Sequence, residues 1–461
     1  MPSTFLGIEI GASGLAASQL GQDVTGNNIT NANTPGYSVE SADFQANSPL
    51  SPPDAIGGSL PNGQIGTGVS AAGISRATDQ FLDNQVRSAN ASLGSQNAQS
   101  DALQQIEQAY GEPSSSGLNE TLTNFYQSFN AVVSDPSNLG ARASVIQNAV
   151  AAVDSFQSVG AQLDSIGTQL GAKSAADVQS INSYATQIAA LNGVIRASNT
   201  AGQQPNTLLD QRDQLLDKLS TLVNINYQSN PDGTDNVAIG TTDLVVGVTA
   251  NAVTLPGLQS RGDLQSGELA GVVQAQAALQ TNKTALNGLA AAVTQQVNAV
   301  HSAGAGLDGS TGLNFFTATT GNEADSIAVN PTLVADPSKL AAAAVPAGGG
   351  APAPGDSANA ASLAALQSQT VGSLNNTTVL GYYQQVVTSA GSQSATAQTA
   401  AASALSSQTQ LSQQRQSVTG VSSDQEMIKM LQYQRAYQAS ANVVQTMDSM
   451  LDTLITGLFS S

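Results

Sequence analysis

The last forty residues carry a repeat of apolar and small side chains that few structures can accommodate. The repeat starts at Met430 and advances in alternating steps of three and four residues over four heptads, which is the seam pattern of a coiled coil. No Pro or Gly interrupts residues 421–456. A helix over residues 427–456 would be about 45 Å long at ~1.5 Å per residue. The expected seam consists of Met430, Tyr433, Tyr437, Ser440, Val444, Met447, Leu451, Leu454 and Leu458.

The first thirty residues show a weaker repeat of the same length. Apolar or small residues recur there every seven positions, which predicts a second helix with a seam. A lone helix of this size is marginal in water, so we expect the helices at the two ends to pair with each other. The repeating sets are Leu6, Ser13, Leu20 and Asn27, and Ile10, Ala17 and Val24, with Ile8 and Leu15 broadening the same face.

An asparagine-rich segment, "GNNITNANTPGY" (26–37), follows the first helix. Asn caps helices and tolerates left-handed backbone, and Pro35-Gly36 suits the two central positions of a type II turn. We therefore expect this segment to end the helix, redirect the chain and satisfy backbone groups at the bend. The residues expected to form the bend are Asn28, Asn31, Asn33, Thr34, Pro35, Gly36 and Tyr37.

Between the two ends the pattern is mostly helical, with one stretch of strands. "GTGVSAAGIS" (66–75) fits a strand or hairpin arm, and β-rich runs in 221–264 surround a hairpin turn at 230–233. Residues 303–357 are rich in loop and linker residues, and Gly420 marks a break in the last helical stretch. Helices are predicted over 77–109, 118–133, 140–170, 174–197, 206–220, 268–302 and from Ala358 onward.

These patterns predict a mainly α fold. It is a long helical bundle with paired N- and C-terminal coiled-coil helices and a small inserted β domain. The helices before and after the insert should form one bundle, with the termini at one end and the insert at the other. The predicted segments are 1–44 (axial helix and turn), 45–220 (first part of the bundle), 221–264 (β insert), 265–420 (second part of the bundle) and 421–461 (C-terminal axial helix).

Composition excludes several classes of function. The net charge is −19 and the 13 basic residues are scattered, so the chain lacks the basic patch that nucleic-acid binding needs, and its acidity disfavours anionic lipid. No apolar run approaches the ~20 residues that span a bilayer, and the N-terminus lacks the basic start of a secretory signal. With no Cys and one His, structural zinc, thiol catalysis and most His-based metal sites are excluded. We expect no catalytic residue, cofactor or metal.

Four short motifs have plain structural interpretations. His301 has no Cys partner and no second His, and no GxSxG elbow supports a Ser–His–Asp triad, so a capping or hydrogen-bonding role is expected. Arg261-Gly262-Asp263 spells an adhesion tripeptide but is interpreted as a surface turn leaving the insert. "NPDGTDN" (230–236) lacks the ligand spacing of a calcium loop. Arg212 and Asp213 are interpreted as helix-surface charges with local ion pairs.

The two ends together resemble a known family. "LAASQLGQDVTGNNITNANTPGYS" is similar to the N-terminal motif of the bacterial flagellar axial proteins, and "QEMIKMLQYQRAYQASANVVQTMDSMLDTLI" to their C-terminal helix. Within that family the middle segments resemble hook-associated protein 1. These segments are "NFYQSFNAVVSDPSNLGARASVIQNA", "LLDQRDQLLDKLSTLVNINY" and "AAVTQQVNAVHSAGAGLDGSTGLNFF".

The resemblance implies a non-enzymatic structural protein of the extracellular flagellum, at the junction between hook and filament. It implies a ring of identical subunits contacting hook protein and hook-associated protein 3, with the seam and bend residues above forming the assembly interface. It also implies export through the flagellar type III apparatus without a cleaved signal peptide, guarded by a cytosolic chaperone at the C-terminal helix. Alternatives are another axial protein (hook or distal rod), an extracellular coiled-coil adhesin or hydrolase, and a cytosolic coiled-coil scaffold.

Overall fold

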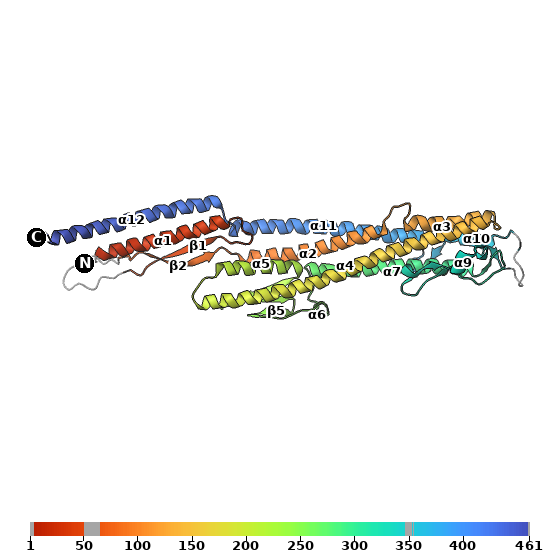
Figure 1. Ribbon diagram of the computed structural model, residues 1–461, viewed down its shortest axis with the longest axis horizontal. Coiled ribbons are helices and arrows are strands. Elements are labelled where there is room, and N and C mark those ends of the chain that lie inside the picture. Colours follow the sequence, from red (N-terminus) through yellow and green to blue (C-terminus); the bar gives the residue numbers. More distant parts are fainter. Residues whose placement is uncertain (1–3, 50–64, 346–352, 354, 460–461) are drawn as a thin grey trace. The chain divides into compact units, whose positions relative to one another are not determined.

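The computed structural model describes residues 4–49, 65–345, 353 and 355–459 (Figure 1). The chain divides into two compact units, each assembled from separate stretches of sequence. The first unit contains residues 1–91, 180–263 and 406–461, and the second contains residues 92–179 and 264–405. Three helices contribute residues to both units, namely α2 (Gln80–Tyr110), α4 (Leu139–Thr200) and α11 (Val379–Thr419).

The first unit combines the two terminal helices with two antiparallel sheets. Strands β1 and β2 form a hairpin with a bulge between Asp43 and Phe44, and β3 to β6 form a four-stranded sheet in sequence order. The remaining elements of this unit are α1 (Thr4–Asn31), β1 (Glu40–Ala46), β2 (Val69–Arg76), α5 (Asn206–Leu222), β3 (Ile225–Ser229), β4 (Asp235–Ile239), β5 (Thr242–Val246), β6 (Thr249–Ala250), α6 (Leu255–Arg261) and α12 (Ser423–Phe459).

The second unit packs short elements onto long helices. Three two-stranded pairs, β7–β10, β8–β9 and β11–β12, fasten its loops. Its elements are α3 (Leu118–Ser134), α7 (Glu268–His301), β7 (Gly304–Ala305), β8 (Phe316–Thr317), α8 (Glu323–Ser326), β9 (Ala328–Val329), α9 (Pro331–Ala335), η1 (Pro337–Lys339), β10 (Ala343–Ala344), α10 (Ala358–Ala365), η2 (Leu366–Ser368), β11 (Thr370–Val371), η3 (Gly372–Leu374) and β12 (Thr377–Thr378).

An aromatic cluster forms the core of the second unit. In α3, Phe125 and Phe129 are one turn apart and fully buried, and Phe315 and Phe316 reach them from the loop after α7. The ring centroids of Phe125 lie 5.5 Å from those of both loop phenylalanines. Burying each such side chain stabilises the unit by roughly 1.5–3 kcal/mol. The "NFF" segment is therefore a core anchor for the loop.

His301 and Asn298 at the end of α7 hold that loop in place. His301 is fully buried; its Nδ1 lies 2.7 Å from the Leu313 carbonyl oxygen, and its Nε2 accepts a hydrogen bond from the Ala341 amide. The Asn298 side chain accepts from the amides of Phe315 and Phe316. The predicted hydrogen-bonding role of His301 is confirmed.

Most predicted helices are confirmed to within three residues at each end, as are the β insert and the break at Gly420. The helix predicted from Ala358 onward is wrong over residues 366–378, where short turns and the β11–β12 pair separate α10 from α11, because Asn375 and Asn376 adopt left-handed backbone that a helix does not contain. The separate helices predicted over 140–170 and 174–197 are wrong, because they are the single helix α4. No Pro lies in the connecting segment, and the Ser174 hydroxyl donates to the Gly171 carbonyl inside the helix. Residues 50–64 of the predicted first part of the bundle, and residues 346–352 and 354 of the predicted loop and linker stretch 303–357, lie outside the described residues.

The position of the β insert also differs from expectation. Of the helices before the insert, α3 and parts of α2 and α4 share the second unit with α7, as predicted, but α5, directly before the insert, lies in the first unit, so the single bundle predicted for all of them is wrong. The insert itself lies in the first unit with both chain termini, so its predicted place at the opposite end is wrong. The boundaries of the five predicted segments stay a prediction. In the part of the chain that the structure describes, no helix is long and apolar enough to cross a bilayer.

Candidate functional site

The two terminal helices, α1 and α12, pack side by side and antiparallel (Figure 1). Glycines of α1 lie directly under side chains of α12. A Cβ atom built on Gly7 would lie 2.8 Å from the Met447 side chain, and one on Gly21 would lie 2.7 Å from the Tyr433 ring. Between them, Gly11 meets Val444 in the same way at 2.6 Å. The helices approach so closely because α1 presents hydrogen atoms where other residues carry side chains.

The contact face of α1 is one residue away from the predicted one. It follows positions 7, 11, 14, 18, 21, 25 and 28, which keep the same three-and-four spacing. Ser18 and Thr25 on this face are buried, and their hydroxyls bond back to carbonyls of the same helix. The predicted seam of Leu6, Ile10, Leu20 and Val24 flanks this face, because small residues allow a closer approach than leucine. Leu6, Ile10 and Leu20 are half-buried, and Val24 is buried.

The predicted seam of α12 faces α1 over most of its length. Met430, Tyr433, Ser440, Val444, Met447 and Leu451 are all half-buried. The Tyr433 ring also meets Phe44 of β1 edge to face, with centroids 6.1 Å apart. Tyr437 and Leu454 are 40% and 53% exposed, and the side chain of Leu458 lies outside the described residues. Whether these residues form an assembly interface stays a prediction.

The bend after α1 is the predicted type II turn. The Tyr37 amide donates to the Thr34 carbonyl, so Pro35 and Gly36 occupy the two central positions. Gly36 has a φ of +76°, which this turn type requires and which side chains disfavour. Thr34 is further held by Asn31, since its hydroxyl donates to the Asn31 side chain. Asn33 is exposed.

Asn28 is the centre of the bend. Its side-chain oxygen accepts from the Tyr37 hydroxyl at 2.7 Å and from the Glu40 amide at 2.9 Å. Its side-chain nitrogen donates to the Glu40 carbonyl and to the Glu426 carboxylate, both at 2.8 Å. Asn28 is fully buried and Glu426 is 2% exposed. This one amide therefore joins the end of α1, the start of β1 and the start of α12.

The bend also docks onto α5. The Gln214 side chain donates to the Pro35 carbonyl at 2.7 Å, and the Ser38 amide donates to Asp210. Next to it, the Val39 amide donates to the Thr419 carbonyl where α11 ends. The asparagine-rich segment and the "DQRDQLLD" segment, distant in sequence, therefore form one site.

Aspartates and arginines alternate along this site. Asp210, Asp213 and Asp217 lie on one face of α5 and bind arginines from β2, α2 and α11. Arg76 bridges Asp210 and Asp213 at 2.8 and 2.7 Å, and Arg87 bridges Asp213 and Asp217 at 2.8 and 3.0 Å. Burial alone would raise the pKa of Asp213, but Arg76 and Arg87 outweigh it and hold that pKa below its ordinary value.

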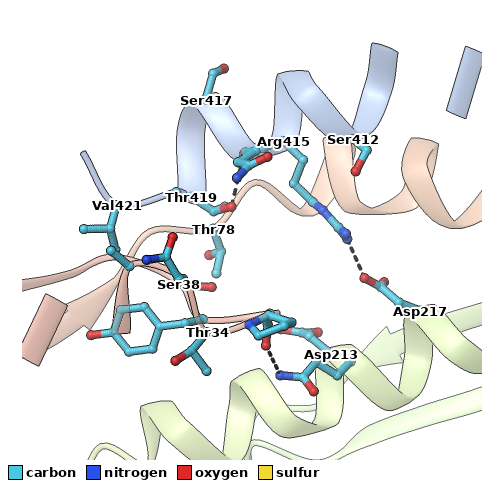
Figure 2. A pocket seen from close by; sticks show the side chains of 18 of the residues that line it. Thr34, Ser38, Thr78, Asp213, Asp217, Ser412, Arg415, Ser417, Thr419 and Val421 are labelled. Carbon is cyan, nitrogen blue, oxygen red and sulfur yellow. Dashed lines mark hydrogen bonds and ion pairs between the residues drawn. The ribbon is translucent and has the colours of Figure 1, made fainter. Parts of the chain in front are cut away.

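A polar cavity of about 610 Å³ lies between the bend, α5 and the break between α11 and α12. Figure 2 shows Arg415 of α11 reaching Asp217 of α5 beside it, at 2.7 Å. Arg415 also lies 3.6 Å from Asp83 of α2. Burial raises the pKa of Asp83 above its ordinary value. Among the described residues, no cluster of three or more His, Cys, Asp or Glu side chains is arranged to hold a metal ion.

Sequence reasoning missed these buried charges. Arg212 and Asp213 are not local surface charges, because Arg212 is 5% exposed and its Nε lies 2.9 Å from Asp235 of the β insert. The Arg261-Gly262-Asp263 turn caps α6, but Asp263 is 2% exposed and accepts hydrogen bonds from Thr241 and Thr242. The spacing of Asp210, Asp213 and Asp217 on one helix face was the available signal.

The α1–α12 pair leaves apolar side chains open on both flanks of its seam. Phe5 on α1 is 63% exposed. On α12 the exposed apolar side chains are Met427, Ile428, Leu431, Val443, Met450, Leu454 and Ile455. Exposed apolar surface of this kind is typical of sites that bind protein.

Three family models match this chain, one at each end and one in the middle. The model described as "Flagella basal body rod protein" matches residues 8–37, which are α1 and the bend. The model described as "Flagellar basal body rod FlgEFG protein C-terminal" matches residues 412–457, which include most of α12. The model described as "Flagellar hook-associated protein FlgK helical domain" matches residues 103–316. The terminal pair is thus similar to rod proteins, and the middle to hook-associated proteins.

Curated relatives match nearly the whole chain. Flagellar hook-associated protein 1 of Bacillus subtilis (strain 168) is 31% identical, over 99% of this chain and 99% of that protein. The protein of the same name from Escherichia coli (strain K12) is 28% identical, over 96% and 98%. The flagellar hook junction protein FlgK from Burkholderia pseudomallei has a similar fold, with a TM-score of 0.65 at 17% identity, covering 73% of this chain and all of that one. This chain belongs to the flagellar hook-associated protein 1 family.

Proposed function

We propose that this protein joins the flagellar hook to the filament, as a ring of copies held together by their paired terminal helices. Its family makes it a structural component of the flagellum that associates with other axial proteins. The position at the hook–filament junction is a more specific proposal than membership of the family. It is supported by the name of the Burkholderia pseudomallei neighbour as a hook junction protein.

The observation that carries the proposal is the half-covered α1–α12 pair. One face of each helix is used within the chain, and the flanks leave large apolar side chains such as Leu431 and Met450 about half exposed. Identical pairs lying side by side in an inner tube would cover these flanks. The predicted interface residues Leu6, Ile10 and Leu20, displaced from the seam, then become contacts between copies.

The glycines of α1 support folding upon assembly. This helix has five glycines in 28 residues, and each disfavours the helix by roughly 0.5–1 kcal/mol relative to Ala. α1 is therefore a poor helix unless α12 covers it. We expect both terminal segments to be disordered in the free chain and to become ordered on assembly. A chain of this kind can be exported unfolded, and a chaperone at α12 would shield its apolar side chains beforehand.

In this proposal the ring contacts hook protein on one side and hook-associated protein 3 on the other. Its role is mechanical and extracellular, and it requires no catalytic group. The partly buried Asp–Arg chain on α5 fits such a role, because it fastens α5 to β2, α2 and α11 through charged hydrogen bonds, each worth ~1.5–3 kcal/mol.

Deletion of the gene tests the proposal directly. Electron microscopy of the deleted strain should show bare hooks, with filament subunits released into the medium. Intact filaments on the hooks would overturn the junction role. A copy of the gene restored in trans should return the filaments, which controls for effects on neighbouring genes.

A further inference from the structure

The glycine seam between α1 and α12 does not determine its own register. Glycines of α1 recur every seven residues, and so do the side chains of α12 that lie on them. Sliding one helix past the other by seven residues, about 10 Å at ~1.5 Å per residue, would therefore place glycine under a side chain again. The packing of small residues leaves such shifted pairings available. The three matching pairs are Gly7 with Met447, Gly14 with Ser440 and Gly21 with Tyr433.

The connection between α11 and α12 leaves room for such a shift. It consists of Gly420, Val421 and Ser422, and it lines the polar cavity of about 610 Å³ described above. Unwinding the first two turns of α12 would release length for a shift, because an extended residue spans ~3.3 Å against ~1.5 Å in a helix. The register therefore needs a determinant inside the pair itself.

Asn28 and Glu426 form a polar pair at one end of this seam. Among the described residues of α12, Glu426 is the only one that is buried, at 2% exposed. Its Oε2 accepts a hydrogen bond from Asn28 Nδ2 at 2.8 Å, and its Oε1 accepts one from Lys429 Nζ at 2.7 Å. A carboxylate is costly to bury unless its partners are in place. Its position therefore ties α12 to the level of Asn28.

The side chain of Asn28 is held in one orientation by the N-terminal segment. Its oxygen accepts from the Tyr37 hydroxyl and the Glu40 amide, and one N–H donates to the Glu40 carbonyl. The second N–H is thereby directed at α12, where Glu426 accepts it. A shift of seven residues brings the Tyr433 ring to this N–H, and the opposite shift leaves Glu426 beside Gly21. Either shift leaves a buried polar group without its partner, which is costly.

We propose that the hydrogen bond between Asn28 and Glu426 selects the register of the α1–α12 pair. In coiled coils a single buried polar residue specifies register at a cost in stability. The glycines supply the close approach of the two helices, and the polar pair supplies their alignment. This inference goes beyond the proposed function but rests on it in one respect, because the terminal segments are expected to pair only in the assembled protein.

Disulfides can report the register, because the natural chain has no Cys. Gly14→Cys with Ser440→Cys gives the native link, since a Cβ atom on Gly14 would lie 3.3 Å from Ser440 Cβ, close to the ~3.8 Å of a disulfide. Gly14→Cys with Met447→Cys gives a shifted link only after a slide of seven residues, and Gly14→Cys with Tyr433→Cys gives one after the opposite slide. In the observed register both shifted positions are about 10 Å too far along α12.

Tagged chains that carry these reporters are produced in the deleted strain together with the natural chain, which supports assembly. Isolated flagella are oxidised, and mass spectrometry of the linked peptides quantifies each disulfide. With Glu426 in place, only the native link should form.

Substitutions at Glu426 should then move the link. Glu426→Leu should lower the native link several-fold and produce a shifted one. Glu426→Gln should keep the native link, because its amide oxygen still accepts from Asn28. The matched control Asp424→Leu, at an exposed position in the same turn, should keep it too. Moving the carboxylate, with Glu426→Leu and Tyr433→Glu together, should make the link from 14 to 447 the main product, since residue 433 faces Asn28 after a slide of seven.

Three outcomes overturn the inference. An unchanged native link in Glu426→Leu would show that the register needs no acceptor on α12. A weaker native link without any shifted link would show that Glu426 only stabilises the pair. A shifted link in Glu426→Gln or Asp424→Leu would show that this hydrogen bond is not what selects the register.

Exclusion of the Glu426→Leu chain from flagella would leave the decision to the variant with the moved carboxylate. Its entry with the shifted link supports the inference, and every other result for it refutes the inference. Absence of even the natural chain from flagella would instead refute the proposed function.

Discussion

Replacing Gly11 with Ala should have two opposite effects, and their balance tests the close approach of α1 and α12. Ala stabilises a helix relative to Gly by roughly 0.5–1 kcal/mol. In the pair, however, the new Cβ would lie 2.6 Å from Val444 Cγ2 and 3.4 Å from backbone atoms of Ser440 and Val444. Overpacking of this kind costs about 1–3 kcal/mol. The paired state should lose more than the helix gains.

Gly26→Ala is the matched control. It makes the same change in the same helix, but its new Cβ would lie 3.9 Å from the nearest atom, Met430 Cε. It should therefore keep the full gain in helix stability. Both variants gain the same intrinsic helix stability, so the difference between their free energies of pairing equals the overpacking cost of about 1–3 kcal/mol. That cost is a factor of roughly 5–150 in the equilibrium constant for pairing.

Amide hydrogen exchange of α1 and α12, measured on isolated hook preparations that carry the chain, reads out this difference. Protection of α1 should fall in Gly11→Ala and rise in Gly26→Ala. Adding Val444→Ala to Gly11→Ala removes the clashing methyl and should restore part of the protection. Equal protection in the two glycine variants would refute the close packing described above.

Three further predictions concern other parts of the chain. Asp213→Asn breaks charged hydrogen bonds to Arg76 and Arg87 and should lower the free energy of unfolding, measured by urea titration, by about 3 kcal/mol. The control Asp243→Asn, at an exposed position, should change it by less than ~0.5 kcal/mol. Equal effects of the two substitutions would contradict the ion-pair network around Asp213. Leu451→Pro breaks α12, so it should abolish incorporation into flagella while the rest of the chain stays soluble. Cell fractionation measures both effects. Normal assembly of this variant would contradict the α1–α12 pair. Burial lowers the pKa of His301 below its ordinary 6.5. Because the imidazole is then protonated more readily in the unfolded chain than in the folded one, the free energy of unfolding should fall as pH drops below 6.5. The slope should be at most ~1.4 kcal/mol per pH unit. His301→Gln should lose that slope relative to the natural chain.

Periodicity and turn chemistry were sufficient to predict the terminal helices and the bend. A break in a three-and-four repeat, or a Pro-Gly pair, constrains the backbone locally, so Gly36 and Gly420 could be interpreted correctly from the sequence alone. The seam of α1 could not be placed to the residue. Periodicity gives the spacing of a contact face, but the choice between Leu6 and Gly7 depends on how closely the partner helix approaches.

The charged part of the site depends on contacts between distant residues, which local patterns do not contain. Arg212 looks like a surface residue on α5, and only the fold brings Asp235 of the β insert to it. Asn28 similarly looks like one capping residue among several asparagines. Its burial against Glu426, nearly four hundred residues later, makes it the centre of the bend. A buried polar residue of this kind is recognised only once its partners are known.

Imaging the hook–filament junction itself by cryo-electron microscopy, in cells that produce this chain, tests the central claim most directly. We expect antiparallel α1–α12 pairs lining an inner tube between hook and filament, with Gly7 under Met447 and Gly21 under Tyr433 of the same chain. Terminal helices on the outside of the structure would contradict it. So would α1 of each copy pairing with α12 of a neighbour instead of its own.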